Sequence, residues 1–231
     1  MFSFEELQDF YRKFLERLCT SDDLARFFET GEEGDFIEWW KSIPRGHKSI
    51  GAAYGATKAV IWDNSLPYVL KIPFGYPNDE LKDYCEIETE NYSLAQEIPE
   101  ISVFFAKSQF LFEFRGVPIY LMDKAKCNES EIEDRAFTSG LAHYEKLNKF
   151  QKNINKKDFF TFSDKFVHSC DEDRIHDLLV EQWGEEVVNI FWEFCENNCI
   201  NDLHFGNWGI LNDKVVLVDY SGYYGDFDSS Y

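Results

Sequence analysis

The chain has 231 residues, 44% of them hydrophobic and 18% aromatic, and its formal net charge is −20. This hydrophobic content supports a sizeable core, in one large domain or in two small lobes around a cleft, and it excludes a disordered chain. The negative charge argues against nucleic acid or an anionic membrane as the main partner, because both would repel the protein.

Nothing in the sequence indicates a secretion signal or a membrane-spanning segment. Three acidic residues occur within the first ten positions, and no apolar run approaches the length that crosses a bilayer. The six cysteines are scattered and lack histidine partners at zinc-ligand spacing, so we expect free thiols. These features predict a cytoplasmic protein in a reducing environment, with no membrane partner.

The N-terminal part of the chain predicts a run of helices. Ser3 and Glu6 form a capping-box pattern, and apolar residues recur at helical spacing over residues 4–18. A second helix is expected to follow Ser21, and residues 35–40 predict a short third one. The dense aromatic residues of this region are typical of core packing.

Residues 49–122 predict a small antiparallel sheet that carries one helix. The expected elements, in chain order, are a tight turn at Gly51–Gly55, strands at 57–62 and 68–72, a helix at 79–96, and strands at 103–114 and 117–122. One of these strands must split to give five. The pair Arg115–Gly116 predicts the hairpin between the last two.

The remainder of the chain predicts mainly helices, followed by a loop and a short hairpin. Helices are expected at 130–150, 173–182 and 185–197, with a lysine-rich linker at 151–158. The loop and hairpin fill the stretch from Asp202 to Asp219.

The spacing of polar residues in this last stretch indicates a function. Asp202 is followed five residues later by Asn207, and Asp219 comes twelve residues after Asn207, at the end of an apolar run. A loop aspartate can accept the proton of a substrate hydroxyl, while amide and carboxylate oxygens suit Mg²⁺. We expect His204 to shape the loop.

Upstream residues offer the groups that a phosphate needs. Gly51 and Gly55 would let backbone amides approach phosphate oxygens. Lys71 lies between apolar neighbours on a predicted strand, so it needs a carboxylate partner if it is buried. The following helix supplies three candidates: Glu86, Glu88 and Glu90. We favour Glu88, with Glu90 second, although helical phase does not separate them.

The order of glycine turn, strand lysine, helix glutamate, Asp-x-x-x-x-Asn, apolar strand and aspartate resembles the protein-kinase-like superfamily. The resemblance covers about residues 50–224 and is closer to aminoglycoside and choline kinases, and to small bacterial or phage kinase-like proteins, than to eukaryotic protein kinases. It implies an α+β, bilobal, protein-kinase-like fold. Its parts would be an N-terminal helical extension (1–48), a small antiparallel-sheet N-lobe (49–122) and a truncated, mostly helical C-lobe (123–231).

The resemblance also implies a role for each matched residue. Lys71, with its glutamate, would hold the α- and β-phosphates of ATP. Asp202 would be the catalytic base, and Asn207 and Asp219 would bind Mg²⁺.

Residues 121–125 would form the hinge whose backbone reads adenine, which places Met122 and Lys124 at the nucleotide. The sequence departs from the family pattern in four ways, one of which is Tyr220–Ser221 in place of the Phe-Gly that usually follows the metal aspartate. The glycine loop has two glycines instead of three, and Asn201 replaces the arginine that protein kinases carry before the catalytic aspartate. Twelve residues follow Asp219, which leaves no room for an activation segment, so we expect a truncated C-lobe.

The sequence therefore predicts an ATP-dependent, Mg²⁺-requiring phosphotransferase that acts on a hydroxyl of a protein or a small molecule. Two alternatives stay open. One is a catalytically inactive, kinase-like binding or regulatory protein, and the other is nucleotidyl (AMP) transfer by the same residues. The sequence does not identify the acceptor.

Overall fold

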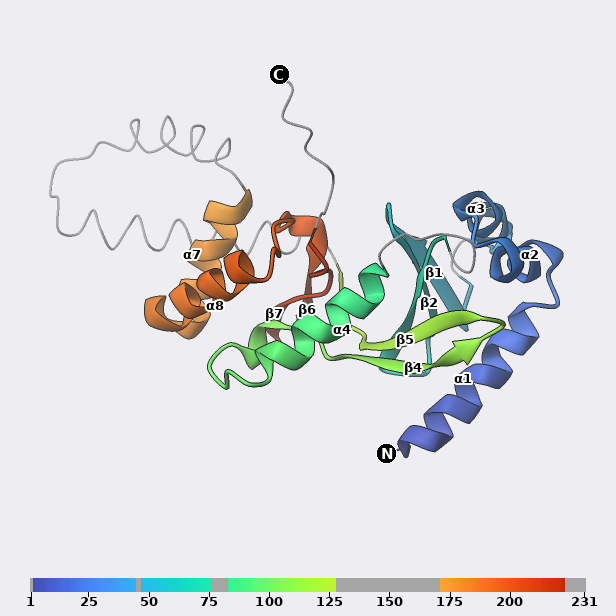
Figure 1. Ribbon diagram of the computed structural model, residues 1–231, viewed down its shortest axis with the longest axis horizontal. Helices are drawn as coiled ribbons and strands as arrows, with labels where there is room; N and C mark the ends of the chain where they lie inside the picture. The colour runs from blue at the N-terminus through green and yellow to red at the C-terminus, as the bar shows by residue number, and fades with distance from the viewer. Residues whose placement is uncertain (1, 45–46, 76–82, 128–170, 223–231) are drawn as a thin grey trace, which may run out of the picture. The chain divides into compact units, whose positions relative to one another are not determined.

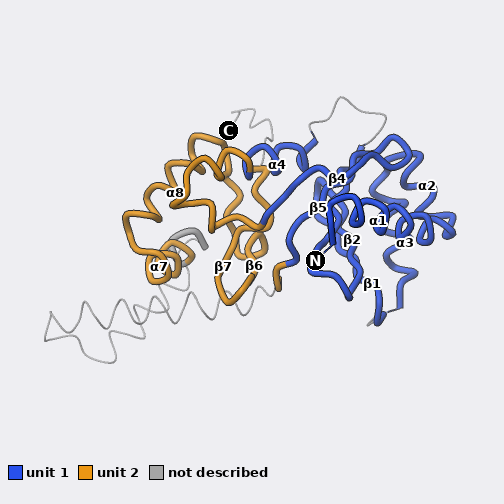
Figure 2. Tube along the Cα trace, turned by 90° about the horizontal axis from the view of Figure 1, so that it is seen from below, with its two compact units in different colours: residues 1–92, 107–124 blue, residues 93–106, 125–231 orange. Residues whose placement is uncertain are grey.

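The structure is a computed structural model that describes residues 2–44, 47–75, 83–127 and 171–222 (Figure 1). The predicted α+β class and five-stranded antiparallel sheet are both present. The chain divides into two compact units (Figure 2): unit 1 comprises residues 1–92 and 107–124, and unit 2 comprises residues 93–106 and 125–231. Within the described ranges, every helix is too short or too polar to cross a bilayer.

Unit 1 begins with three helices: α1 (Phe4–Leu18), α2 (Asp22–Thr30) and α3 (Glu33–Ser42). The predicted capping box at the start of α1 is confirmed. Glu6 N donates to Ser3 Oγ at 3.2 Å, and Ser3 N donates to Glu6 Oε2 at 2.7 Å. Helix α2 ends at Gly31, whose φ of 71° is the left-handed conformation common at helix C-termini.

The sheet of unit 1 has the strand order β1-β2-β3-β5-β4, and all neighbouring strands are antiparallel. The strands are β1 (Ile50–Tyr54), β2 (Lys58–Asp63), β3 (Tyr68–Pro73), β4 (Ser108–Phe114) and β5 (Val117–Asp123). The predicted turn between β4 and β5 is confirmed, with positive φ at both Arg115 and Gly116.

One face of the sheet shares a hydrophobic core with α1, α2 and α3. Leu70 and Ile72 of β3 and Leu121 of β5 are fully or almost fully buried in this core, beside aromatic residues of the three helices. Lys71 lies between Leu70 and Ile72, so strand alternation directs it to the opposite face. The opposite face carries α4 (Tyr84–Ala95), as the contacts of Lys71 show below.

Two predictions about strand boundaries were wrong. Gly51 is the second residue of β1 and not part of a tight turn, because the alanines that follow it pair with β2. The turn begins only at Gly55, whose N–H donates to the carbonyl of Lys58 at 3.0 Å.

The predicted strand at 103–114 is shorter than expected. Its first residues belong to a 3-10 helix, η1 (Ser102–Phe104), and β4 starts only at Ser108. The reason is that Phe104 stacks on Phe191 in the core of unit 2, with ring centroids 4.6 Å apart. Tertiary packing therefore draws this segment away from the sheet.

The described part of unit 2 also contains α7 (Asp171–Trp183), α8 (Glu185–Asn197), η2 (Phe205–Asn207) and a hairpin of β6 (Trp208–Leu211) and β7 (Lys214–Leu217). Helix α8 has the predicted boundaries. The η1 segment joins the hairpin through the bond from Ala106 N to Leu217 O, at 3.0 Å. The predicted helix at 130–150 and linker at 151–158 lie outside the described residues.

Candidate functional site

A buried ion pair joins β3 to α4. Lys71 Nζ lies 2.9 Å from Glu88 Oε1 and 2.8 Å from Glu88 Oε2. The exposed fraction is 5% for Lys71 and 0% for Glu88, whereas Glu86 and Glu90 are exposed. Of the three glutamates on this helix, Glu88 is thus the partner of Lys71.

A second buried lysine, Lys58, contacts the same glutamate, and the sequence reasoning missed it. Its Nζ lies 2.6 Å from Glu88 Oε1, and it is 3% exposed. Lys58 is the first residue of β2, two positions before Val60, which pairs with Lys71. Alternation along β2 therefore puts Lys58 on the same face of the sheet as Lys71.

Helix α4 is fixed in place by its cap and by two contacts with the sheet. Asp83 Oδ1 accepts hydrogen bonds from the backbone N–H groups of Cys85, at 2.9 Å, and Glu86, at 3.0 Å. Its other oxygen accepts a 2.6 Å hydrogen bond from the Tyr120 hydroxyl of β5, and Thr89 of α4 hydrogen-bonds Ser108 of β4 at 3.0 Å. This anchoring sets where Glu88 meets the two lysines.

The environment of this helix also shifts two pKa values. Burial, followed by the hydrogen bond to Asp83, raises the pKa of Tyr120. Burial raises the pKa of the Cys85 thiol well above its ordinary value. Both groups are therefore neutral at physiological pH.

The two predicted glycines have different structural roles. Gly55 opens the turn between β1 and β2, and a Cβ added there would meet nothing within 4 Å. Gly51 faces Trp62 across the β1–β2 pair, and a Cβ there would collide with the indole ring. The lack of a side chain at Gly51 is thus explained by packing against Trp62.

The predicted hinge residues lie at the end of β5. Met122 is buried and pairs with Val69, on the Lys71 face of the sheet. Lys124 Nζ lies 3.3 Å from Asn64 Oδ1 and 5.4 Å from the centroid of the Trp62 ring, near the turn between β2 and β3. Burial lowers the pKa of Lys124. The structure thus brings Lys71 and Glu88 together and places Lys124 at the β2–β3 turn.

In unit 2, Asn207 ties the loop of Asp202 to the segment after β7 that carries Asp219. Asn207 Nδ2 donates to the backbone carbonyl of Asp202 at 2.7 Å. The backbone carbonyl of Asn207 accepts from Val218 N at 2.8 Å and from Asp219 N at 3.3 Å. Asn207 is 7% exposed, and its other side-chain polar atom, Oδ1, is an acceptor of the kind that binds cations.

His204 shapes this loop, as predicted. Its Nδ1 accepts a 3.0 Å hydrogen bond from Gly206 N and caps η2, so a neutral His204 carries its proton on Nε2. Nε2 lies 3.6 Å from Asp202 Oδ1. The Asp202 side chain is about half exposed, at 49%.

Residues 220–222, which follow Asp219, are held by hydrogen bonds and close packing. Ser221 Oγ lies 3.3 Å from Asp219 Oδ1, and the Tyr220 hydroxyl donates to Ala106 O at 2.7 Å. Gly222 has a φ of 70°, and a Cβ there would collide with the backbone carbonyl of Cys199. The segment that carries Asp219 is therefore held against Ala106 through Tyr220 and against Cys199 through Gly222.

The donor set of this loop fits a magnesium ion better than a zinc ion. In the part of the chain that the structure describes, no group of three His, Cys, Asp or Glu residues is arranged to hold a metal. Asn207 and Asp219 instead offer one amide oxygen and one carboxylate. Mg²⁺ is typically bound by one or two carboxylates and completes its shell with water and substrate phosphate.

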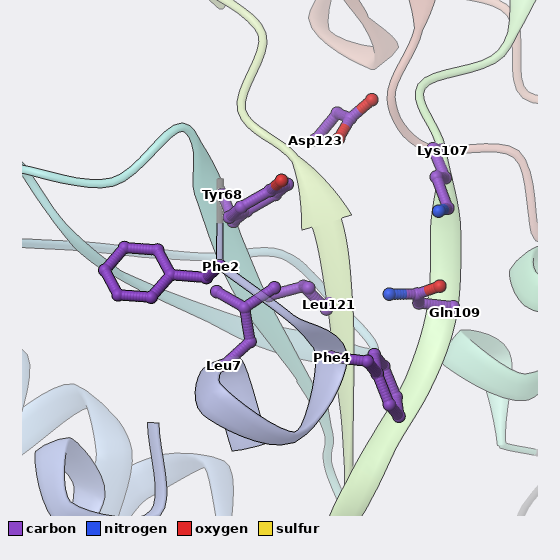
Figure 3. A pocket seen from close by; sticks show the side chains of 8 residues that line it. All are labelled: Phe2, Phe4, Leu7, Tyr68, Lys107, Gln109, Leu121 and Asp123. Carbon is purple, nitrogen blue, oxygen red and sulfur yellow. The ribbon is translucent and has the colours of Figure 1, made fainter. Parts of the chain in front are cut away.

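A separate pocket of about 360 Å³ lies in unit 1, between the start of α1 and strands β3, β4 and β5 (Figure 3). It is lined by Phe2, Phe4, Leu7, Tyr68, Lys107, Gln109, Leu121 and Asp123. Leu121 and Tyr68 point to the α1 side of the sheet, away from Lys71. This pocket is therefore not the space beside the Lys71–Glu88 pair.

The candidate residues thus form two clusters. Lys58, Lys71 and Glu88 meet within unit 1, and the segments of Asp202, Asn207 and Asp219 are tied together within unit 2. Comparison of the chain with protein-family models, with curated proteins and with solved structures gave no match.

Proposed function

We propose that the protein is an ATP-dependent, Mg²⁺-requiring phosphotransferase with a protein-kinase-like bilobal fold, in which unit 1 is the N-lobe and unit 2 the C-lobe. The observation that carries this proposal is the buried Lys71–Glu88 ion pair. Replacing a buried ion pair by well-packed apolar residues is often neutral or stabilising. A pair buried between a strand and a helix is therefore better explained by a function than by stability.

In this proposal, Lys71 binds the phosphates of the nucleotide and Glu88 positions the Lys71 ammonium group. The bidentate contact at 2.8 and 2.9 Å fixes the direction of the lysine side chain. The capped and anchored helix α4 holds Glu88 in turn. Preorganised charge of this kind supplies much of the catalysis in phosphoryl transfer.

The loop of unit 2 supplies the remaining groups. Asp202, with its half-exposed carboxylate, orients the acceptor hydroxyl and takes its proton. Asn207 Oδ1 and the Asp219 carboxylate would hold Mg²⁺, which neutralises phosphate charge when it is bound. Met122 and Lys124 would border the adenine at the hinge. The acceptor is a hydroxyl of a protein or a small molecule.

Two matched substitutions test this proposal. Asp202→Asn and Asp219→Asn each change one carboxylate to an amide, and we expect each to lower turnover by at least about 100-fold, as loss of a positioned base or an electrostatic group does. Asp213→Asn, at the tip of the same hairpin, is the control. Its φ of 64° suits asparagine, so turnover should stay near the wild-type value.

The measurement is release of phosphate and labelling of the protein or of candidate acceptors with ATP labelled at the γ- or the α-phosphate. Label from the γ-position, lost in both variants, supports phosphoryl transfer. Label from the α-position instead indicates AMP transfer. Mg²⁺-ATP binding without turnover in the wild type indicates a kinase-like binding protein, and turnover that survives both substitutions contradicts the proposed site.

A further inference from the structure

The pocket of unit 1 that lies between α1 and the sheet has an apolar end and a polar end (Figure 3). Its volume of about 360 Å³ is at the small end of the roughly 300 to 1,000 Å³ that small-molecule sites occupy. The apolar end includes Phe2 and Phe4, which are 52% and 44% exposed, and buried Leu7. An apolar ligand body at this end would remove the two exposed rings from water.

The register of three strands gathers the polar side chains of the pocket on one face of the sheet. Tyr68 of β3 pairs with Asp123 of β5, and Gln109 of β4 pairs with Leu121. Lys107 directly precedes β4, and its carbonyl accepts a 2.9 Å hydrogen bond from Asp123 N. Lys107 and Gln109 lie on one side of the pocket, and Tyr68 and Asp123 lie on the other (Figure 3).

Two of these side chains carry opposite charges without forming an ion pair. Among the residues that the structure describes, neither the Asp123 carboxylate nor the Lys107 ammonium group contacts another side chain through a hydrogen bond or an ion pair. Asp123 is half-buried, and burial raises the pKa of its carboxyl, whereas the charge and the backbone N–H of Lys107 oppose this rise. The two charged groups are thus close enough to interact but leave space for a ligand.

Opposite charges on two sides of a small pocket suit a ligand that carries the complementary pair. An ammonium group would bind at Asp123, beside the Tyr68 hydroxyl, and a carboxylate would accept hydrogen bonds from Lys107 and Gln109. A hydrocarbon body attached to these groups would fill the apolar end. An α-amino acid with an apolar side chain combines these three parts in one small molecule.

We propose that this pocket binds a free α-amino acid with an apolar side chain, with its ammonium group at Asp123 and its carboxylate at Lys107. Its side chain would pack on Phe2 and Phe4. The pocket is on the α1 side of the sheet, opposite the face of Lys71, so it is separate from the proposed nucleotide site. Amino-acid binding here does not depend on the proposed phosphotransferase function.

The test measures the binding of matched small molecules to the whole chain by calorimetry. The probes are phenylalanine, leucine, phenethylamine, which lacks the carboxylate, phenylpropionate, which lacks the ammonium group, and glycine, which lacks the apolar body. We expect phenylalanine or leucine to bind most tightly, and loss of either charged group from the phenyl probes to weaken binding about 10- to 100-fold, the value of a hydrogen bond to a charged group. A wild type that binds neither amino acid, or that binds phenethylamine or phenylpropionate as tightly as phenylalanine, overturns the proposal.

Variants of the two charged residues should change the binding of different probes. Asp123→Asn should weaken phenylalanine and phenethylamine by about 10-fold or more and leave phenylpropionate unchanged, whereas Lys107→Met should weaken phenylalanine and phenylpropionate and leave phenethylamine unchanged. Phe4→Ala should weaken all three alike. Lys48→Met and Glu113→Gln, at exposed positions of unit 1 outside the pocket, should bind every probe as the wild type does. Charge variants that weaken all probes equally, or none, contradict the assignment, and a urea titration separates loss of binding from loss of folding.

Discussion

Glu88 is the residue on which two buried ammonium groups depend. Removing one partner of a buried ion pair typically costs about 3 to 5 kcal/mol. Lys58 and Lys71 would both be affected, because each donates to Glu88. The charge arrangement therefore bears on the stability of unit 1.

We accordingly expect Glu88→Ala to lower the free energy of unfolding by about 3 kcal/mol or more. Glu90→Ala, on the same helix but exposed, should change it by less than about 0.5 kcal/mol. Urea titration followed by circular dichroism measures both. Equal effects of the two substitutions would show that Glu88 is not compensating buried charge.

The cysteines should differ in reactivity according to burial. Cys127 and Cys199 are exposed, Cys85 and Cys195 are buried, and burial raises the pKa of both buried thiols. For half-buried Cys19, burial raises the pKa to about 11. Since the thiolate is the reactive form, only about one Cys19 in a thousand is reactive at about pH 8.

Among the cysteines that the structure describes, we therefore expect iodoacetamide at about pH 8 to modify Cys127 and Cys199 first, with Cys85 and Cys195 protected until the protein unfolds. The rate at Cys19 should rise about tenfold per pH unit up to about pH 11, if the fold persists. Peptide mass spectrometry over time gives the order. Early labelling of Cys85 in the native protein would contradict its burial on α4.

At the scale of elements, two glycines differ sharply in what they tolerate. Gly34 lies in α3, is exposed, and has open space around the position of a Cβ. Gly222 has a positive φ, and its Cβ position meets the carbonyl of Cys199. Alanine should favour the helix at the first position and strain the backbone at the second.

We expect Gly34→Ala to raise the free energy of unfolding by about 0.5 to 1 kcal/mol. Gly222→Ala should lower it by more than about 1 kcal/mol and disturb the segment that carries Asp219. Thermal unfolding of the two variants provides the measurement. A stabilising Gly222→Ala would show that the chain after Asp219 is not packed against Cys199.

The elements also show what the sequence alone could predict. Local signals succeeded: the capping box of α1, the boundaries of α8 and the turn at Arg115–Gly116 all depend on neighbouring residues. Errors arose where distant contacts decide the conformation, as at Gly51, which packs on Trp62, and at Phe104, which packs on Phe191.

The same distinction applies to the candidate site. The order of Lys71, Glu88, Asp202, Asn207 and Asp219 could be read from the sequence, but not which glutamate turns inward. Lys58 was missed for a related reason. Strand alternation assigns it to a face only when the register of β2 against β3 is known, and that register is a non-local property.

At the scale of the whole molecule, the N-terminal helices are part of unit 1 and not an independent extension of it. Phe14, Phe28 and Phe36 share a core with Leu70 and other sheet residues. Removing the helices would expose the apolar face of the sheet to water.

We expect a chain that starts at residue 48 to lose the folded state of unit 1. Dye binding to exposed apolar surface and aggregation on a sizing column would report this, and the proposed binding of Mg²⁺-ATP should be lost with it. Removal of residues 1–2, before α1 begins, is the control. A soluble, ATP-binding protein without the three helices would contradict the shared core.

Residues 93–106 belong to unit 2 although they lie between two segments of unit 1, and this affects the order in which the units fold during synthesis. All residues of unit 1 have been added to the nascent chain once Lys124 is reached. Ala106 bonds Tyr220, however, and Tyr220 is added 114 residues after Ala106. At about 5 to 20 residues per second, that interval is roughly 6 to 23 seconds. For most of this interval, until Phe191 has been added, Phe104 and Phe105 lack their packing partner. Unit 1 can therefore fold before unit 2 during translation, and the apolar segment around Phe104 and Phe105 stays unpacked in the meantime.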